Sequence, residues 1–189
     1  MALILAPILS PAQNTARQDE VLKRIVEASA AIESFSCDFR QVRELAILSE
    51  PDVSEGMMQY NRSGTIVWRY TSPSAYQVSF TKDAVLITRD GQIQSMSFSD
   101  NPYLGSLREL LLGIMGGGEF APDGQFQVTV TQYEPETVVS MVPLRRQLRR
   151  LFSEIVISFS ARDHLVSQVA LKDADGGSTT ISFTNQKTN

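Results

Sequence analysis

Residues 66–80 read IVWRYTSPSAYQVSF, and the alternation in this stretch decides the fold. Pro73 divides the stretch into two short runs. Every second residue in both runs is apolar or aromatic: Ile66, Trp68, Tyr70, Tyr76, Val78 and Phe80. Successive side chains of a strand point to opposite faces of its sheet. The stretch therefore predicts two neighbouring strands that share one apolar face.

Similar short runs recur along most of the chain, with turn residues between them. They fall at residues 35–48, 58–61, 85–88, 92–98, 126–130, 138–142, 155–159, 166–170 and 179–183. Asp90-Gly91 and Asp175-Gly176-Gly177 are typical of hairpin turns. Short strands at regular spacing indicate one large antiparallel sheet of about ten to eleven strands. The predicted fold class is mainly β with some α.

Two segments have helical rather than strand periodicity. Residues 18–34 place apolar side chains on one broad face. Residues 106–115 do the same, with Ser106 as the expected N-cap, and their apolar face consists of Leu107, Leu110, Leu111 and Ile114. A short apolar helix between a proline and three glycines is well placed to move. Periodicity alone favours an ordinary crossover helix packed on the sheet.

The apolar face of the sheet predicts an interior with room for a ligand. Phe39 and the six residues of the 66–80 stretch are the expected lining. Two helices offer little cover for so large a sheet, so part of the interior is expected to be a cavity. A simple packed core is the alternative that the sequence leaves open.

Charge and composition restrict the functional classes. The 189 residues carry a formal net charge of −4, with 42% hydrophobic and 20% charged residues, which fits one globular domain and not a polyanion binder. Nucleic acid is therefore not an expected partner. The basic cluster Arg145, Arg146, Arg149 and Arg150 is interpreted as a solvated turn or helix face. The alternative is a contact for anionic head groups or an acidic partner.

The N-terminus indicates export. Residues 1–9 are nearly all apolar, and Ser10-Pro11-Ala12 resembles a cleavage site, so residues 1–12 are expected to be the end of a signal peptide. A short apolar strand or tail is the alternative. Residues 13–189 then form a single domain, soluble because no later run is long enough to span a bilayer. The single cysteine, Cys37, alternates with Phe35 and Phe39 and is expected to be a small buried hydrophobe.

Catalytic motifs are scarce. The single histidine, His164, falls in an expected turn, and no ligand spacing suggests a metal site. The 116–118 glycine run lacks the lysine of a phosphate-binding loop, and no G-x-S-x-G elbow is present. Neither an enzyme activity nor a cofactor is therefore expected.

Several motifs, in their order, resemble the periplasmic outer-membrane lipoprotein carrier family, LolA. Residues 34–41, SFSCDFRQ, match its S-F-x-x-x-F-x-Q entry into the first strand. The further matches are Gly56, Arg62, Trp68-Arg69-Tyr70, Pro73, Arg89-Asp90-Gly91, the helix at 107–114, and the closing strands with Ile155–Phe159, Asp173, Asp175-Gly176, Ile181, Phe183 and Asn185. The resemblance covers about residues 18–189. One departure is Ser63-Gly64, where the family usually has proline after its arginine.

The resemblance implies a half-open antiparallel β-barrel covered by a helical lid. Arg62 matches the arginine with which the family latches its lid, and Leu107, Leu110, Leu111 and Ile114 match the lid. The implied function is to hold the acyl chains of lipoproteins and move them from the inner to the outer membrane. The implied partners are acylated lipoproteins, an inner-membrane lipoprotein-releasing transporter and an outer-membrane receptor. The implied setting is a monomer in the periplasm of a Gram-negative bacterium.

A second function suits the same fold. A periplasmic module could bind another lipid or a glycolipid, or could sense envelope stress. An acylated peptide that co-purifies with the protein would favour the carrier, and a free glycolipid would favour the second function.

Overall fold

The fold is described from a computed structural model covering residues 11–45, 49–116, 124–133 and 135–189. Its helices are α1 (Pro11–Ala30), α2 (Pro102–Gly116) and α3 (Arg146–Arg149). Its strands are β1 (Ser34–Glu44), β2 (Asp52–Asn61), β3 (Ile66–Ser72), β4 (Tyr76–Phe80), β5 (Ala84–Arg89), β6 (Gln92–Ser97), β7 (Phe126–Tyr133), β8 (Glu136–Pro143), β9 (Phe152–Ser160), β10 (Val166–Asp173) and β11 (Ser178–Thr188). None of the described helices is long and apolar enough to cross a membrane.

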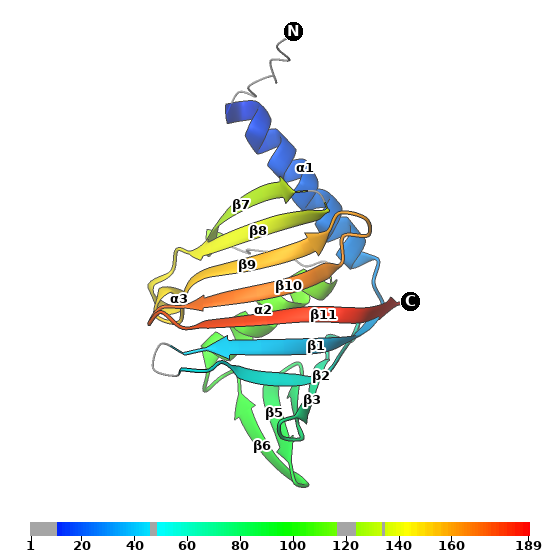
Figure 1. The fold of residues 1–189 in the computed structure, drawn as a ribbon, viewed down its shortest axis with the longest axis vertical. Helices are drawn as coiled ribbons and strands as arrows, with labels where there is room; N and C mark the ends of the chain where they lie inside the picture. The colour runs from blue at the N-terminus through cyan, green and yellow to red at the C-terminus, as the bar shows by residue number, and fades with distance from the viewer. Residues whose placement is uncertain (1–10, 46–48, 117–123, 134) are drawn as a thin grey trace.

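All eleven strands form one antiparallel sheet that does not close on itself. Its order is β6-β5-β4-β3-β2-β1-β11-β10-β9-β8-β7. Each half of the chain is a meander of neighbouring hairpins, and the two halves meet where β1 pairs with β11, with Phe39 opposite Phe183. The strongly twisted sheet curves around α2, which lies behind its middle strands in Figure 1. The prediction of a half-open antiparallel β-barrel is confirmed.

The predicted pairing of the 66–80 stretch is also confirmed. The register places Ile66 opposite Phe80, and Trp68 opposite Val78. Tyr70 is likewise directly opposite Tyr76 on the neighbouring strand. These side chains therefore share the concave face, because directly opposed residues of an antiparallel pair lie on one side of the sheet.

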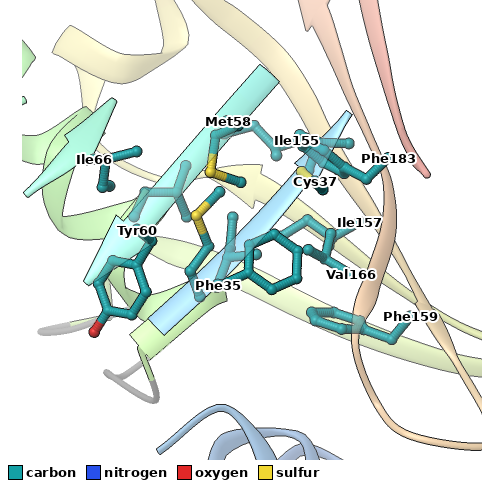
Figure 2. Packing of buried hydrophobic residues seen from close by; sticks show 14 of the residues in the cluster. Phe35, Cys37, Met58, Tyr60, Ile66, Ile155, Ile157, Phe159, Val166 and Phe183 are labelled. Atoms are coloured by element: carbon teal, nitrogen blue, oxygen red, sulfur yellow. The ribbon is translucent and has the colours of Figure 1, made fainter. Parts of the chain in front are cut away.

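The core lies on this concave face. Buried side chains from β1, β2, β3 and from β9, β10 and β11 meet there (Figure 2). Cys37 is only 3% exposed, which confirms it as a buried hydrophobe. Burial and, to a lesser degree, the neighbouring Asp38 carboxylate raise the pKa of its thiol to about 12. The thiol therefore stays protonated and unreactive near neutral pH.

The helix boundaries differ from the sequence predictions. Helix α1 starts at Pro11 and ends at Ala30, not at residue 34, because the chain already turns into β1 at Ser34. Ser106 is not the N-cap of α2, since it lies in the second turn. Pro102 opens that helix, a position where proline is favoured because it lacks an N–H. A third, short helix, α3, contains part of the arginine cluster, for which a solvated turn or helix face was the interpretation.

The expected signal peptide falls mostly outside the described residues. Only Pro11 and Ala12 of that segment are described, and both belong to α1. The glycines at 117 and 118 also lie outside the described part of the chain.

Candidate functional site

An apolar cavity of about 190 Å³ lies between α2 and the concave face of the sheet. Both halves of the sheet contribute to its wall, and the helix contributes its cover. The lining residues are Trp68, Tyr70, Val78, Phe80, Leu107, Leu111, Val169, Leu171, Ile181 and Phe183. None of the described residues that line it is charged. The cavity is therefore suited to hydrocarbon and not to a polar or ionic ligand.

Aromatic contacts hold the wall in place. The Phe39 ring meets the Trp68 and Tyr70 rings edge-on, with centroids 4.9 and 5.0 Å apart. Trp68 in turn lies 5.9 Å from Phe183, across the junction of β1 and β11. Edge-to-face rings at these distances attract one another beyond their burial. The wall is thus rigid where the two halves of the sheet meet.

Four of the seven residues predicted for the lining lie on the cavity: Trp68, Tyr70, Val78 and Phe80. The other three lie beside it. Phe39 is 2% exposed and packs behind Trp68, and Ile66 is fully buried in the core. Tyr76 stacks on Tyr70 with ring centroids 4.3 Å apart and lines a neighbouring pocket.

The residues predicted for the lid divide into two pairs. Leu107 and Leu111, one turn apart on α2, face the cavity. Leu110 and Ile114 are buried, and the Ile114 carbonyl accepts a hydrogen bond of 3.3 Å from the Ser29 hydroxyl of α1. One face of α2 therefore covers the cavity while a second is held against α1.

The lining also includes four residues of β10 and β11 that were not predicted, namely Val169, Leu171, Ile181 and Phe183. The run at 166–170 was predicted as a strand, without an inward face. A bulge between Val166 and Gln168 shifts the register. Because a bulge inserts one extra residue, the inward face changes from Val166 to Val169 and Leu171. The apolar pair Val169 and Leu171 was the available signal.

Arg62 lies in the β2–β3 turn and contacts the end of α1. Its guanidinium donates to the Ala30 carbonyl at 2.7 Å and pairs with the Glu33 carboxylate at 3.1 Å. A cation at the C-terminal end of a helix is favoured by the partial negative charge there. Arg62 therefore joins the turn to α1, and it makes no described contact with α2.

Arg108 provides the contact between the same turn and α2, and the sequence analysis did not single it out. Its guanidinium donates to the Gly64 carbonyl at 3.0 Å. Gly64 has a φ of +82°, and a Cβ there would lie 2.8 Å from the Arg108 Nη2 atom. The turn favours a glycine at this position because of the positive φ, since the flexible Arg108 side chain could move away from a Cβ. Arg62 and Arg108 together hold the β2–β3 turn to both long helices.

The described residues offer little for catalysis. None of them forms a cluster of three or more potential metal ligands. His164 occupies the β9–β10 turn with a φ of +58°, and its backbone N–H bonds to the Ser160 carbonyl at 2.9 Å. Burial raises the pKa of the Tyr70 phenol, so this residue stays neutral in the cavity wall.

The fold and this cavity define a class: an open β half-barrel whose concave face and covering helix enclose an apolar ligand site. The sequence model of the family described as "Outer membrane lipoprotein carrier protein LolA" matches residues 30–189. The chain therefore belongs to the LolA family. No curated protein matches the sequence.

Solved structures with a similar arrangement come from several bacteria. A LolA superfamily protein of Nitrosomonas europaea is 9% identical, with 91% of this chain and 93% of that chain covered and a TM-score of 0.47. A putative outer membrane lipoprotein-sorting protein domain of Vibrio parahaemolyticus is 9% identical, with 93% and 94% covered and a TM-score of 0.48. The Mycobacterium tuberculosis lipoprotein LppX is 11% identical, with 89% and 96% covered and a TM-score of 0.48.

Proposed function

We propose that the chain is a periplasmic carrier that holds lipoprotein acyl chains in the cavity beneath α2 and moves them from the inner to the outer membrane. The observation that carries this proposal is the lining of the cavity, which is apolar on the sheet side and on the helix side. Each methylene that leaves water for such a site gains about 0.8 kcal/mol. The family description, a lipoprotein carrier, supports the same cargo.

The size of the cavity gives α2 a role in loading. An apolar cavity of about 150 Å³ is enough for a benzene molecule, so about 190 Å³ holds only a short part of an acyl chain. An outward movement of Leu107 and Leu111 would make room for the rest. Loading then depends on the contacts that hold α2 over the cavity. These include the hydrogen bonds of Arg62 to α1 and of Arg108 to the β2–β3 turn.

Native mass spectrometry of the protein isolated from the periplasm tests the proposal. An acylated peptide or lipoprotein bound at a ratio of one to one is the expected result. A free glycolipid would instead support the second function, a lipid-binding or sensing module. Protein that is always empty, and that does not take up a fluorescent fatty-acid probe, would overturn both.

Arg62 is proposed to keep the covering helix α2 closed. It acts indirectly, by holding the β2–β3 turn to α1, which in turn contacts α2. The Arg62→Leu variant should remain folded, because its ion pair is exposed and worth at most about 1 kcal/mol. Its acyl probe should exchange faster, because the β2–β3 turn is no longer held to α1. Stopped-flow release of the probe measures this change. Arg24→Leu is the matched control, since it removes an exposed ion pair from α1 away from the turn; equal rates in all three proteins would contradict the latch.

The arginine cluster around α3 is proposed as a contact with anionic membranes. Arg145, Arg146, Arg149 and Arg150 are exposed and form no ion pair with the described residues. Leu144 and Leu151 flank them and are 51% and 39% exposed. Basic residues beside exposed apolar ones suit the interface of an anionic bilayer. A carrier that loads and unloads at membranes needs such a surface.

Vesicle binding tests the membrane contact. The double variant Arg146→Gln/Arg149→Gln should bind phosphatidylglycerol vesicles about thirtyfold more weakly, because each arginine near the surface contributes about 1 kcal/mol. Lys23→Gln/Arg24→Gln removes the same charge from α1 and should change binding far less. Co-sedimentation with anionic and neutral vesicles measures both. Similar losses in the two variants would show that only the net charge matters.

A further inference from the structure

A second pocket adjoins the apolar cavity on the same concave face of the sheet. It has a volume of about 560 Å³ and lies where β4, β5 and β6 end. Unlike the cavity, it is lined by charged and amide side chains together with apolar ones, and the residues that matter below are Tyr76, Ile87, Arg89, Asp90, Gln92 and Gln94. The cavity and this pocket together form one continuous surface. Its lining is apolar at the cavity and includes charged and amide side chains at the pocket.

Two residue pairs connect the cavity to this pocket. Val78 lines the cavity and is directly opposite Ile87, which lines the pocket. Tyr70 lines the cavity and is stacked on Tyr76, which lines the pocket, with an angle of 6° between the ring planes. A molecule in the cavity that extends past these pairs therefore enters the polar pocket.

Arg89 is the cation of the pocket, and its position is fixed by the aromatic stack. The Cζ atom of its guanidinium lies 4.8 Å from the centroid of the Tyr76 ring, whose other face is covered by Tyr70. The guanidinium has no hydrogen bond or ion pair with the described residues. A guanidinium over an aromatic ring leaves its N–H donors free to bind a phosphate or carboxylate.

We propose that this pocket binds the anionic head group, a phosphate or carboxylate, of an amphiphile whose chain occupies the cavity. Arg89 supplies the charge, and the side-chain amides of Gln92 and Gln94 supply further donors. This inference rests on one part of the proposed function, namely that the cavity binds an acyl chain. It adds free anionic lipids to acylated proteins as ligands of the cavity and pocket.

Competition for a bound fluorescent fatty-acid probe tests this inference. The competitors are dodecyl phosphate, laurate and neutral dodecanol, which share one chain length. Both anions should bind about tenfold more tightly than the alcohol, since a hydrogen bond to a charged group contributes that much. Arg89→Gln should remove the preference without weakening the binding of dodecanol.

Asp90→Asn is the matched control with the opposite sign. The Asp90 carboxylate lines the same pocket and repels an anion there. Asparagine tolerates its φ of +51° and suits a turn before Gly91. This variant should therefore bind both anions more tightly than the unaltered protein and dodecanol equally well.

The outcomes separate this inference from the proposed function. Failure of all three competitors to displace the probe would overturn the proposed function and this inference with it. Equal affinities for the anions and the alcohol would overturn the head-group site alone. A loss of dodecanol binding in Arg89→Gln, as large as that of the anions, would also overturn it. A preference for one of the two anions, lost in Arg89→Gln, supports the site and identifies the source of the head group.

Discussion

Leu171→Glu is expected to lower the affinity for an acyl probe by about a hundredfold while the protein stays folded. Leu171 is half-buried on β10 and lines the cavity. A carboxylate there must lose its water when a chain binds, and an uncompensated polar group in an apolar site costs about 3 kcal/mol or more. In the unliganded protein, the same carboxylate can still reach water through the open side of the half-barrel. Probe titration, together with circular dichroism, measures both effects.

Ala170→Glu is the matched control for that result. Ala170 is the neighbouring residue of β10 and therefore points to the opposite face of the sheet. It lies opposite Thr180 on β11 and Val156 on β9. The same charge placed there should leave probe affinity within about twofold, because this face does not line the cavity. Equal losses in the two variants would mean that chains bind elsewhere.

Gly56→Ala is expected to be the most destabilising single change in the sheet. A Cβ at Gly56 would lie 2.0 Å from the Arg69 carbonyl oxygen and 2.9 Å from the Phe39 ring. The first contact is with backbone, so β2 and β3 must move apart to relieve it. Overpacking of this kind costs about 3 kcal/mol, which lowers the midpoint of thermal unfolding by about 10 °C. Thermal unfolding followed by circular dichroism measures the shift.

Gly105→Ala tests the same packing argument at a site where alanine should raise the stability instead of lowering it. Gly105 lies inside α2, and a Cβ there would lie 3.7 Å from the Phe98 Cβ atom, an ordinary contact. Glycine inside a helix is less favourable than alanine by about 0.8–1 kcal/mol, so this variant should be more stable. A lower midpoint for Gly105→Ala, or an unchanged one for Gly56→Ala, would contradict the packing described for these two sites.

The sheet could be predicted because alternation is a local property. Residues 66–80 indicate two strands from spacing alone, and the register confirms that their apolar residues share a face. The face of β10 could not be predicted in the same way. Its bulge depends on pairing with β9, and a change of one residue in register exchanges the two faces. Two of the cavity residues, Val169 and Leu171, were missed for that reason.

The contacts around the cover needed the tertiary structure for a different reason. The start of α2 was predicted at Ser106 because a capping pattern is present there, yet the helix begins at Pro102. Arg108 reaches Gly64 across 44 positions of sequence, and no local pattern signals such a pair. Family resemblance indicated Arg62, whose described side-chain partners are Ala30 and Glu33.

Quenching of Trp68 fluorescence tests the central claim most directly. Trp68 is the single tryptophan of the chain and lines the cavity. A fatty acid brominated along its chain should quench it in a saturable manner, and Leu171→Glu should abolish the quenching while Ala170→Glu preserves it. The absence of saturable quenching, or equal quenching in the Leu171→Glu variant, would show that the cavity beneath α2 does not hold acyl chains.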